Sequence, residues 1–228
     1  MTITLTGITK TYKIGEREIR ALDGISIAIA TGEFTAITGP AGSGKSTLIN
    51  ILGGLDRPTS GSYKIDGEEV TQDDRPMHTG RQLGIISQNF KVLPRMTILQ
   101  HVMLPLIHMD ITKTERQERA ALALNSVGLG ARMRYHPNEL SDLYRQRIAI
   151  ARALVNGPNI ILADEPDCNL DDRDSREIMN IFAKLSRQGR TIIAVSHNER
   201  IAGQAQRVIA VRKGRIVSDK SAAETSIN

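Results

Sequence analysis

Apolar and polar residues alternate along much of the first third of the chain, and this period of two predicts β-strands. The continuous apolar run EFTAIT (33–38) is typical of a buried strand, and the Gly-rich turn after it leads into LINIL (48–52), which predicts a helix. The alternating segments are ITLTGITKTY (3–12), ISIAIA (25–30), SYKIDG (62–67) and LGIISQ (83–88).

The pattern changes near residue 89, where apolar residues recur at the spacing of helices. We expect helices over residues 97–108, 112–129 and 143–155. Strands and helices then alternate again. The predicted strands are NIILAD (159–164) and TIIAVS (191–196), the helices are DSREIMNIFAKLSRQ (174–188) and ERIAGQAQ (199–206), and RVIAVRKGRIV (207–217) forms a terminal hairpin.

Strands that alternate with helices imply an α/β fold with a largely parallel sheet covered by helices. The chain of 228 residues is long enough for one such domain. We expect residues 1–88 and 156–228 to form its strand-rich core and residues 89–155 to form a helical insert.

Composition narrows the function classes. Aromatic residues make up 3% of the chain, which argues against a base-stacking platform for single-stranded nucleic acid. The net charge of +5 fits a nucleic-acid partner, an anionic membrane surface or an anionic ligand, but the sequence has no dense run of Lys and Arg, which favours a mildly basic surface. The lone Cys168 can form no internal disulfide, which favours a reducing, cytoplasmic location. We expect neither a signal peptide nor a membrane-spanning segment, so a membrane role would require a partner.

The turn after the buried strand matches the phosphate-binding pattern G-x-x-x-x-G-K-[ST]. Its glycines let backbone N–H groups approach phosphate oxygens, and the helix after it directs its positive end at the same charge. Lys45 would reach the β and γ phosphates of a nucleotide, and the Ser46 hydroxyl could bind Mg²⁺. The predicted cofactor-binding residues here are Gly39, Pro40, Ala41, Gly42, Ser43, Gly44, Lys45, Ser46 and Thr47.

Two adjacent carboxylates end the apolar strand in IILADEP. Asp164 is placed to hold Mg²⁺, and Glu165 is placed to polarise an attacking water. Acids at a strand end can also cap the next element, but their pairing with a phosphate-binding loop favours the catalytic interpretation. The histidines His78, His101, His108 and His136 have no metal-ligand spacing, and we expect them to be surface or packing residues.

With these motifs the chain resembles the nucleotide-binding subunits of ATP-binding cassette (ABC) transporters over almost its whole length. The resemblance implies a P-loop NTPase (RecA-like) core with an antiparallel β subdomain and an inserted α-helical subdomain. It also implies that Tyr12 stacks on adenine, that Gln88 senses Mg²⁺ and water as a catalytic and metal-binding residue, and that His197 contacts the γ-phosphate. Asn169–Asp171 match the loop that crosses the dimer interface.

Finer features resemble the lipoprotein-releasing and macrolide-export branch of that family, namely RALDGIS, GGLDRPTSG, NFKVLPRMT and VMLPL. In that branch two ATP-binding subunits drive a membrane pair, so the implied partners are integral membrane permease subunits and a second ABC subunit. The implied location is the inner face of the bacterial cell membrane. The surface near Phe90–Met96 would dock the permease, with Arg95 as the residue to mutate.

One motif departs from the family. Where ABC subunits have L-S-G-G-Q, which binds the ATP held by the opposite subunit, this chain has L-S-D-L-Y at residues 140–144. Ser141 is retained and is expected to cap the following helix and to contact that ATP. Asp142 stabilises the helix start but occupies the position of the anion, and like charges 4 Å apart repel by about 4 kcal/mol at an effective dielectric of 20. Pairing with Arg145 would offset only about 0.2–0.5 kcal/mol.

This departure predicts that residues 140–144 bind the ATP of the opposite subunit weakly, whereas the chain's own phosphate-binding site is intact. The chain would then work in a heterodimer with an intact partner, or as a homodimer with weak hydrolysis. Three other interpretations remain: a regulatory ABC ATPase that gates a membrane partner without transport, a soluble ABC protein acting on DNA or in cofactor assembly, and an unrelated P-loop kinase. A kinase leaves Gln88, Asn169–Asp171 and His197 unexplained, and we expect no nucleic-acid partner, because the long insertions of DNA-acting members are missing.

Overall fold

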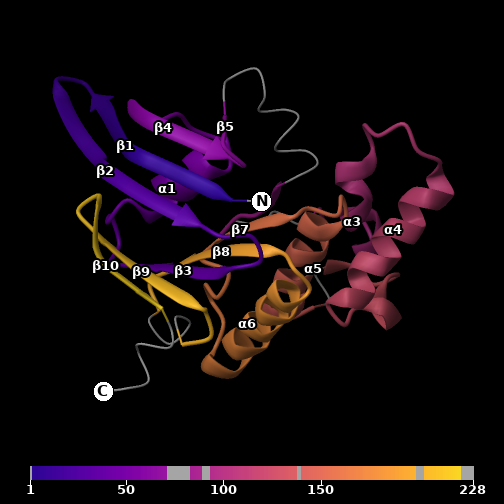
Figure 1. Cartoon of the computed structure of the whole chain (residues 1–228). Coiled ribbons are helices and arrows are strands. Elements are labelled where there is room, and N and C mark those ends of the chain that lie inside the picture. The colour runs from indigo at the N-terminus through magenta and orange to yellow at the C-terminus, as the bar shows by residue number, and fades with distance from the viewer. Residues whose placement is uncertain (1, 71–82, 89–92, 138–139, 199–202, 222–228) are drawn as a thin grey trace.

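A six-stranded, mostly parallel sheet forms the centre of the fold (Figure 1). The computed structural model describes residues 2–70, 83–88, 93–137, 140–198 and 203–221. Strand order is β10-β9-β3-β8-β7-β6, and only β10 runs antiparallel to its neighbour. The strands are β3 (Phe34–Thr38), β6 (Leu83–Ile86), β7 (Ile160–Asp164), β8 (Thr191–Ser196), β9 (Arg207–Arg212) and β10 (Arg215–Ser221).

A second sheet of four antiparallel strands lies beside it, in the order β2-β1-β4-β5. Its long hairpin of β1 and β2 extends away from the rest of the molecule in Figure 1. The sequence predicted only the apolar second half of β2. The polar first half is also a strand because it pairs in register with β1, with Tyr12 opposite Ile19. The strands are β1 (Ile3–Ile14), β2 (Arg17–Ile29), β4 (Ser60–Ile65) and β5 (Glu68–Glu69).

Helix α1 (Lys45–Leu52) lies between the two sheets. Successive residues of a strand point to opposite faces, so alternate residues of the central strands share the core around α1. Ile37, Leu162 and Ile193 pack in this core with Leu48 of the helix and with residues of the second sheet, and all four are fully buried. The packing fixes the start of α1 at the end of β3, where the Gly-rich turn lies.

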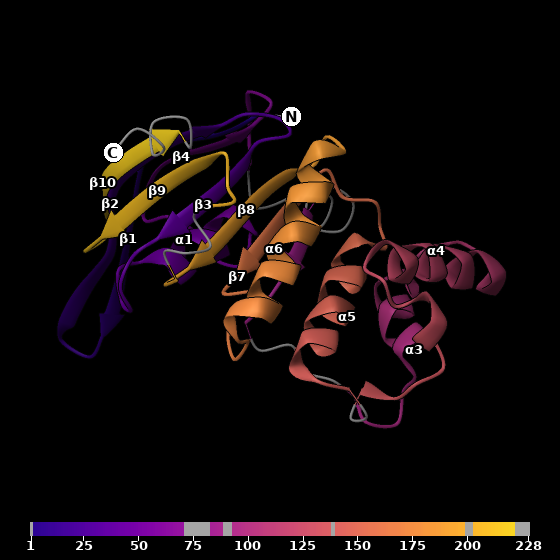
Figure 2. The same ribbon diagram turned by 90° about the horizontal axis from the view of Figure 1, so that it is seen from below.

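Helices cover the opposite face of the central sheet (Figure 2). Ala36, Ala163 and Ala194 of the sheet are buried there against Phe182 of α6, and small residues at these positions let the helix approach closely. Helix α5 lies next to α6 on this face, and α3 and α4 pack against α5 beyond the edge of the sheet. The helices are α3 (Ile98–Met103), α4 (Lys113–Ser126), α5 (Asp142–Leu154) and α6 (Asp172–Arg187), with 3₁₀ turns at Leu104–Leu106 and Gly130–Arg132.

The predicted α/β fold is confirmed, with some differences in its helices. The helix expected over residues 97–108 ends at Met103, because Pro105 has no N–H for a helical bond and a 3₁₀ turn follows. Of the helix expected over 199–206, residues 199–202 lie outside the described part, and 203–206 form turns. Within the residues that the structure describes, no helix has the length and apolar character needed to cross a bilayer.

Candidate active site

The turn between β3 and α1 is built on glycines with positive φ. Gly39, Gly42 and Gly44 have φ values of 152°, 74° and 106°, which side-chain-bearing residues rarely adopt. A Cβ on Gly39 would lie 2.1 Å from the carbonyl oxygen of Val211, and one on Gly44 would lie 2.4 Å from that of Ala21. The turn is therefore closely packed against β9 and β2, and two of its glycines are required by sterics.

Lys45 lies across this turn. Its ammonium donates to the carbonyl oxygens of Gly39 and Pro40 at 2.8 and 2.9 Å, and the residue is only 4% exposed. The Ser43 hydroxyl is buried and has no hydrogen-bond partner among the described residues. A buried cation that donates to neutral carbonyls, beside a hydroxyl with no partner among the described residues and the start of α1, fits an anion such as a phosphate group.

Ser46 and Asp164 meet at the ends of α1 and β7. The Ser46 hydroxyl donates to Asp164 Oδ1 at 3.4 Å, although the two residues are far apart in sequence. Burial raises the pKa of Asp164, and the adjacent Glu165 carboxylate raises it further. A hydroxyl and a carboxylate that face each other at the edge of a phosphate-binding turn are ligands that Mg²⁺ prefers, so these residues fit that ion.

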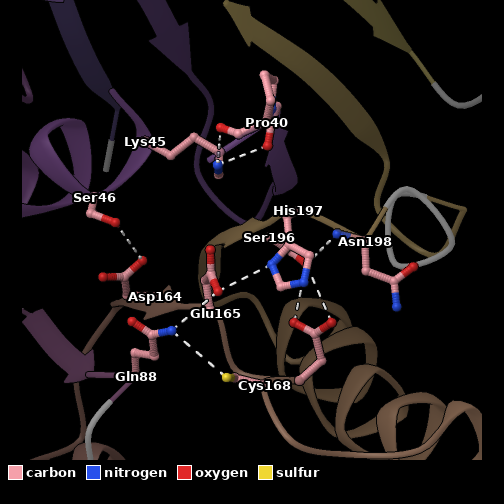
Figure 3. A network of polar contacts seen from close by, with 12 residues as sticks. Pro40, Lys45, Ser46, Gln88, Asp164, Glu165, Cys168, Ser196, His197 and Asn198 are labelled. Atoms are coloured by element: carbon pink, nitrogen blue, oxygen red, sulfur yellow. Dashed lines mark hydrogen bonds and ion pairs between the residues drawn. The ribbon is translucent and has the colours of Figure 1, made fainter. Parts of the chain in front are cut away.

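Glu165 lies at the centre of a polar network, drawn in Figure 3. Its Oε2 accepts from Gln88 Nε2 at 3.3 Å and lies 3.1 Å from His197 Nδ1. These three residues follow β7, β6 and β8, and the carboxyl ends of parallel strands meet at one edge of a sheet. Glu165 also has a φ of 47°, a left-handed conformation that is costly for a side-chain-bearing residue and is typical of functional sites.

A cavity of about 620 Å³ opens beside these groups. Its walls come from β2, the Gly-rich turn, the start of α1, Glu165 and the turn between β9 and β10. Such a volume accommodates a nucleotide-sized ligand. The lining residues are Ile19, Arg20, Ala21, Ala41, Gly42, Gly44, Lys45, Ser46, Thr47, Glu165, Lys213 and Gly214.

Tyr12 lies on β1 outside this wall. Its hydroxyl donates to Asp56 Oδ2 at 2.5 Å, and Lys10 bonds the other oxygen of the same carboxylate at 2.6 Å. The Lys10 ammonium also lies 4.8 Å from the centre of the Tyr12 ring. The stacking of Tyr12 on adenine stays a prediction. Asp56, which holds the ring in place, was not among the residues that the sequence singled out.

Residues Ser141–Tyr144 form the start of α5, away from the cavity walls just described. Ser141 occupies the N-cap position, but the prediction that its side chain caps the helix is wrong, because it makes no such hydrogen bond. Asp142 is exposed and pairs with Arg145 at 3.1 Å, as expected. Leu143 is 8% exposed, and Arg132 stacks 4.3 Å from the Tyr144 ring centre, so both replacements contribute to packing.

Two further side chains join the network without a sequence motif to mark them. The buried Asp167 accepts from the Ser196 hydroxyl, and the Cys168 sulfur lies 3.7 Å from Gln88 Nε2.

His101 is fully buried, with its Nε2 at 3.1 Å from the Leu93 backbone, and burial lowers its pKa. His101 is therefore a packing residue, as expected. His78 and residues 90–92 of the expected docking segment lie outside the described residues.

Comparisons with known proteins agree with this geometry. The family model described as "ABC transporter" matches residues 22–168. The chain is 46% identical over 221 residues to an uncharacterized ABC transporter ATP-binding protein of Bacillus subtilis, YvrO, and covers 96% of both chains. It is 44% identical over 220 residues to the macrolide export ATP-binding/permease protein MacB of Hyphomonas neptunium, covering 95% of this chain and 34% of that one.

A solved structure has the same fold. It is the dimeric, post-hydrolysis state of the ATP-binding cassette MJ0796 bound to ADP and Pi, which matches with a TM-score of 0.87 and 38% identity. The match covers 96% of this chain and 98% of that one.

Proposed function

Because this chain belongs to the ABC transporter family, we propose that it is an ATP-binding and ATP-hydrolysing subunit that powers or gates a membrane permease by ATP-driven dimerisation. The observation that carries the proposal is the convergence of the Gly-rich turn, Ser46, Asp164 and Glu165 on one cavity edge. These groups come from separate elements, and together they provide for phosphate binding, metal binding and general-base catalysis.

Each of these active-site groups has a role in ATP hydrolysis. The N–H groups of the turn bind the phosphates, and Lys45 exchanges its two carbonyl partners for the β and γ phosphate oxygens. Mg²⁺ would be held by Ser46 and Asp164 with Gln88 nearby, and it would neutralise charge on the phosphates. Glu165 polarises the attacking water, and His197 contacts the γ-phosphate.

Contact with a permease would come from the segment before α3. Leu93 is 49% exposed and Arg95 is also exposed, which leaves both side chains available to a partner. Several relatives are export proteins that contain both an ATP-binding part and a permease part, and this chain spans about a third of their length. An export or lipoprotein-release type of permease is therefore the partner we propose, which would hold the chain at the inner face of the bacterial cell membrane.

The start of α5 sets how such a subunit would dimerise. In an ABC dimer the phosphates bound by one chain face this helix end in the other. Here Asp142 places an exposed carboxylate at that end, and its ion pair with Arg145 offsets little of the charge because the pair is largely open to solvent. We therefore infer an asymmetric pair, in which this chain supplies one working phosphate site and a second ABC chain supplies the glycine-containing helix end. A homodimer would hydrolyse ATP weakly.

The test compares the purified chain with a repaired chain that carries Asp142→Gly, Leu143→Gly and Tyr144→Gln. We expect the repair to raise ATP turnover by about tenfold or more, because it removes a like-charge contact worth at least about 1.4 kcal/mol. ATP-induced dimerisation, followed by light scattering, should rise in parallel. Glu165→Gln in the repaired chain is the control and should abolish turnover while it preserves dimerisation.

Two outcomes would contradict parts of the proposal. Equal turnover and dimerisation of the native and repaired chains would show that Asp142 is harmless, and the asymmetric pair would be wrong. Turnover that survives Glu165→Gln would contradict the assigned base.

Asp142 also favours a second candidate, a regulatory ABC ATPase that gates a membrane partner without transport. Slow hydrolysis would suit a switch better than a pump. The two functions separate when the chain is reconstituted with a permease that co-purifies with it. Movement of a substrate across the vesicle membrane supports transport, and ATP-dependent gating without movement supports regulation.

A further inference from the structure

Asp167 links the two loops that carry Glu165 and His197. It lies on the loop between β7 and α6, and only 6% of the residue is exposed. The Ser196 hydroxyl lies 3.1 Å from one of its carboxylate oxygens and 3.3 Å from the other. The same hydroxyl accepts the backbone N–H of Asn198 at 2.9 Å. One buried carboxylate thus holds the residues on both sides of His197.

The side chain of His197 is 57% exposed. Its hydrogen-bonding contact within the described part of the chain is the one from Nδ1 to Glu165 Oε2 at 3.1 Å (Figure 3). An exposed imidazole takes its position from the backbone that carries it. That backbone is anchored by Ser196 and Asn198, and through them by Asp167.

Burying a carboxylate at this point is expensive. Burial raises the pKa of Asp167, whereas the Ser196 and Asn198 side chains and the nearby His197 lower it, and the first effect is the larger. A neutral side chain would fill this space at lower cost. A costly buried acid beside a catalytic group is a pattern typical of functional sites, and here it coincides with a defined hydrogen-bond chain.

We propose that Asp167 is a positioning residue for ATP hydrolysis, which acts through Ser196 to hold His197 against Glu165. The inference rests on the proposed ATPase function and deepens it. Asp167 is not among the residues that line the cavity, so its loss should slow the chemical step more than it weakens ATP binding.

Kinetics of the repaired chain provide the first test. Asp167→Ala should lower kcat by about tenfold and change the KM for ATP by less than about twofold. Asp167→Asn should recover most of the rate, because the amide oxygen still accepts from Ser196. Ser196→Ala should match Asp167→Ala, and the double variant should be no slower than either, because both break one chain of contacts.

Asp219→Asn is the matched control. It removes a carboxylate from an ion pair with Arg207, outside the active site, and should lower thermal stability without changing kcat. A loss of kcat in this control equal to that of Asp167→Ala, or additive losses in the double variant, would overturn the proposal. So would full activity of Asp167→Ala.

Amide hydrogen exchange in the native chain tests the link from Asp167 through Ser196 to Asn198, and this measurement does not require ATP hydrolysis. Asp167→Ala should speed exchange at the Asn198 amide by about tenfold and leave α1 unchanged. Unchanged exchange at Asn198 would overturn the proposal even if no variant hydrolysed ATP. Absence of hydrolysis in the repaired parent chain would instead contradict the proposed function, so the two failures are distinguishable.

Discussion

At the scale of single residues, the turn after β3 places two glycines with positive φ in different surroundings. A Cβ at Gly39 would meet the carbonyl oxygen of Val211 at 2.1 Å, whereas a Cβ at Gly42 would meet nothing within 4 Å. Both positions share the conformational penalty for a side-chain-bearing residue, but only Gly39 has the steric one. The pair therefore separates the two effects within one loop.

We expect Gly39→Ala to lower the free energy of unfolding by about 3 kcal/mol and Gly42→Ala by about 1 kcal/mol. The first value includes overpacking against backbone, which cannot move aside as a flexible side chain can. Urea denaturation of both variants beside the native chain measures the difference. Equal losses would mean that the turn relaxes around the new methyl group, and the steric argument for Gly39 would fail.

At the scale of elements, hydrogen bonds from Arg207 link the β9–β10 hairpin to the strands around it. Its guanidinium makes two 2.6 Å bonds to the Asp219 carboxylate on β10, another to the Ala28 carbonyl oxygen on β2, and one of 3.2 Å to Glu33. The hydrogen bonds from Arg207 hold the pKa of Asp219 below its usual range. The turn of the hairpin lines the nucleotide cavity through Lys213 and Gly214, whereas Arg207 and Asp219 lie toward the other end of the hairpin.

Asp219→Asn should lower the free energy of unfolding at pH 7 by about 1 kcal/mol or less, since the pair is partly exposed. The folded-state pKa of Asp219 is lower than its unfolded-state value, so its stabilisation is present above the unfolded pKa of 3.8 and is lost as pH falls through the folded value. The native and variant chains should therefore differ less in stability at pH 3 than at pH 7. Urea denaturation at the two pH values checks this, and a constant difference would contradict it.

The elements also show which features a sequence can predict. The Gly-rich turn and the two carboxylates at the end of β7 are local patterns, and both lie where the pattern of strands places them. The helix predicted over residues 97–108 is longer than the observed one, because the spacing of apolar residues carries no information about the missing N–H of Pro105. The polar half of β2 was missed because its strand conformation depends on pairing with β1.

Contacts between distant loops were beyond the reach of sequence patterns. Asp167 and Ser196 are 29 residues apart, and no period or spacing relates an acid on one loop to a hydroxyl on another. Likewise, the hydrogen bond between Tyr12 and Asp56 depends on how β1 packs beside the end of α1. The approach of Gln88 and His197 to Glu165 was implied by family resemblance, and the parallel strand order explains it.

At the scale of the whole molecule, the nucleotide cavity and the start of α5 belong to different parts of the fold. The cavity is walled by the two sheets and α1, whereas α5 lies with the helices on the opposite face of the central sheet. A single chain therefore cannot bring Ser141 and Asp142 to its own phosphates without refolding. If both contribute to one site, the second contribution must come from another chain, and the two sites of a mixed dimer can be designed separately.

Mixing two defective chains should restore hydrolysis under the proposed asymmetric arrangement. The first chain is native, with an intact cavity and Asp142 at its helix end. The second carries the repaired helix end and Glu165→Gln, so its own cavity is inactive. In the mixed dimer, only the native cavity facing the repaired helix end is complete. We expect turnover in the mixture to exceed that of either chain alone by about tenfold, since one site regains the stabilisation that the carboxylate removed.

The control mixture replaces the second chain with Glu165→Gln that retains Asp142, and it should show no gain. A gain in both mixtures would mean that any second chain activates the native cavity, whatever its helix end. No gain in either mixture, with dimers present by light scattering, would mean that the cavity of this chain is itself deficient. A gain confined to the repaired mixture would place the defect at the start of α5 and identify the missing component as a partner subunit with a glycine-containing helix end.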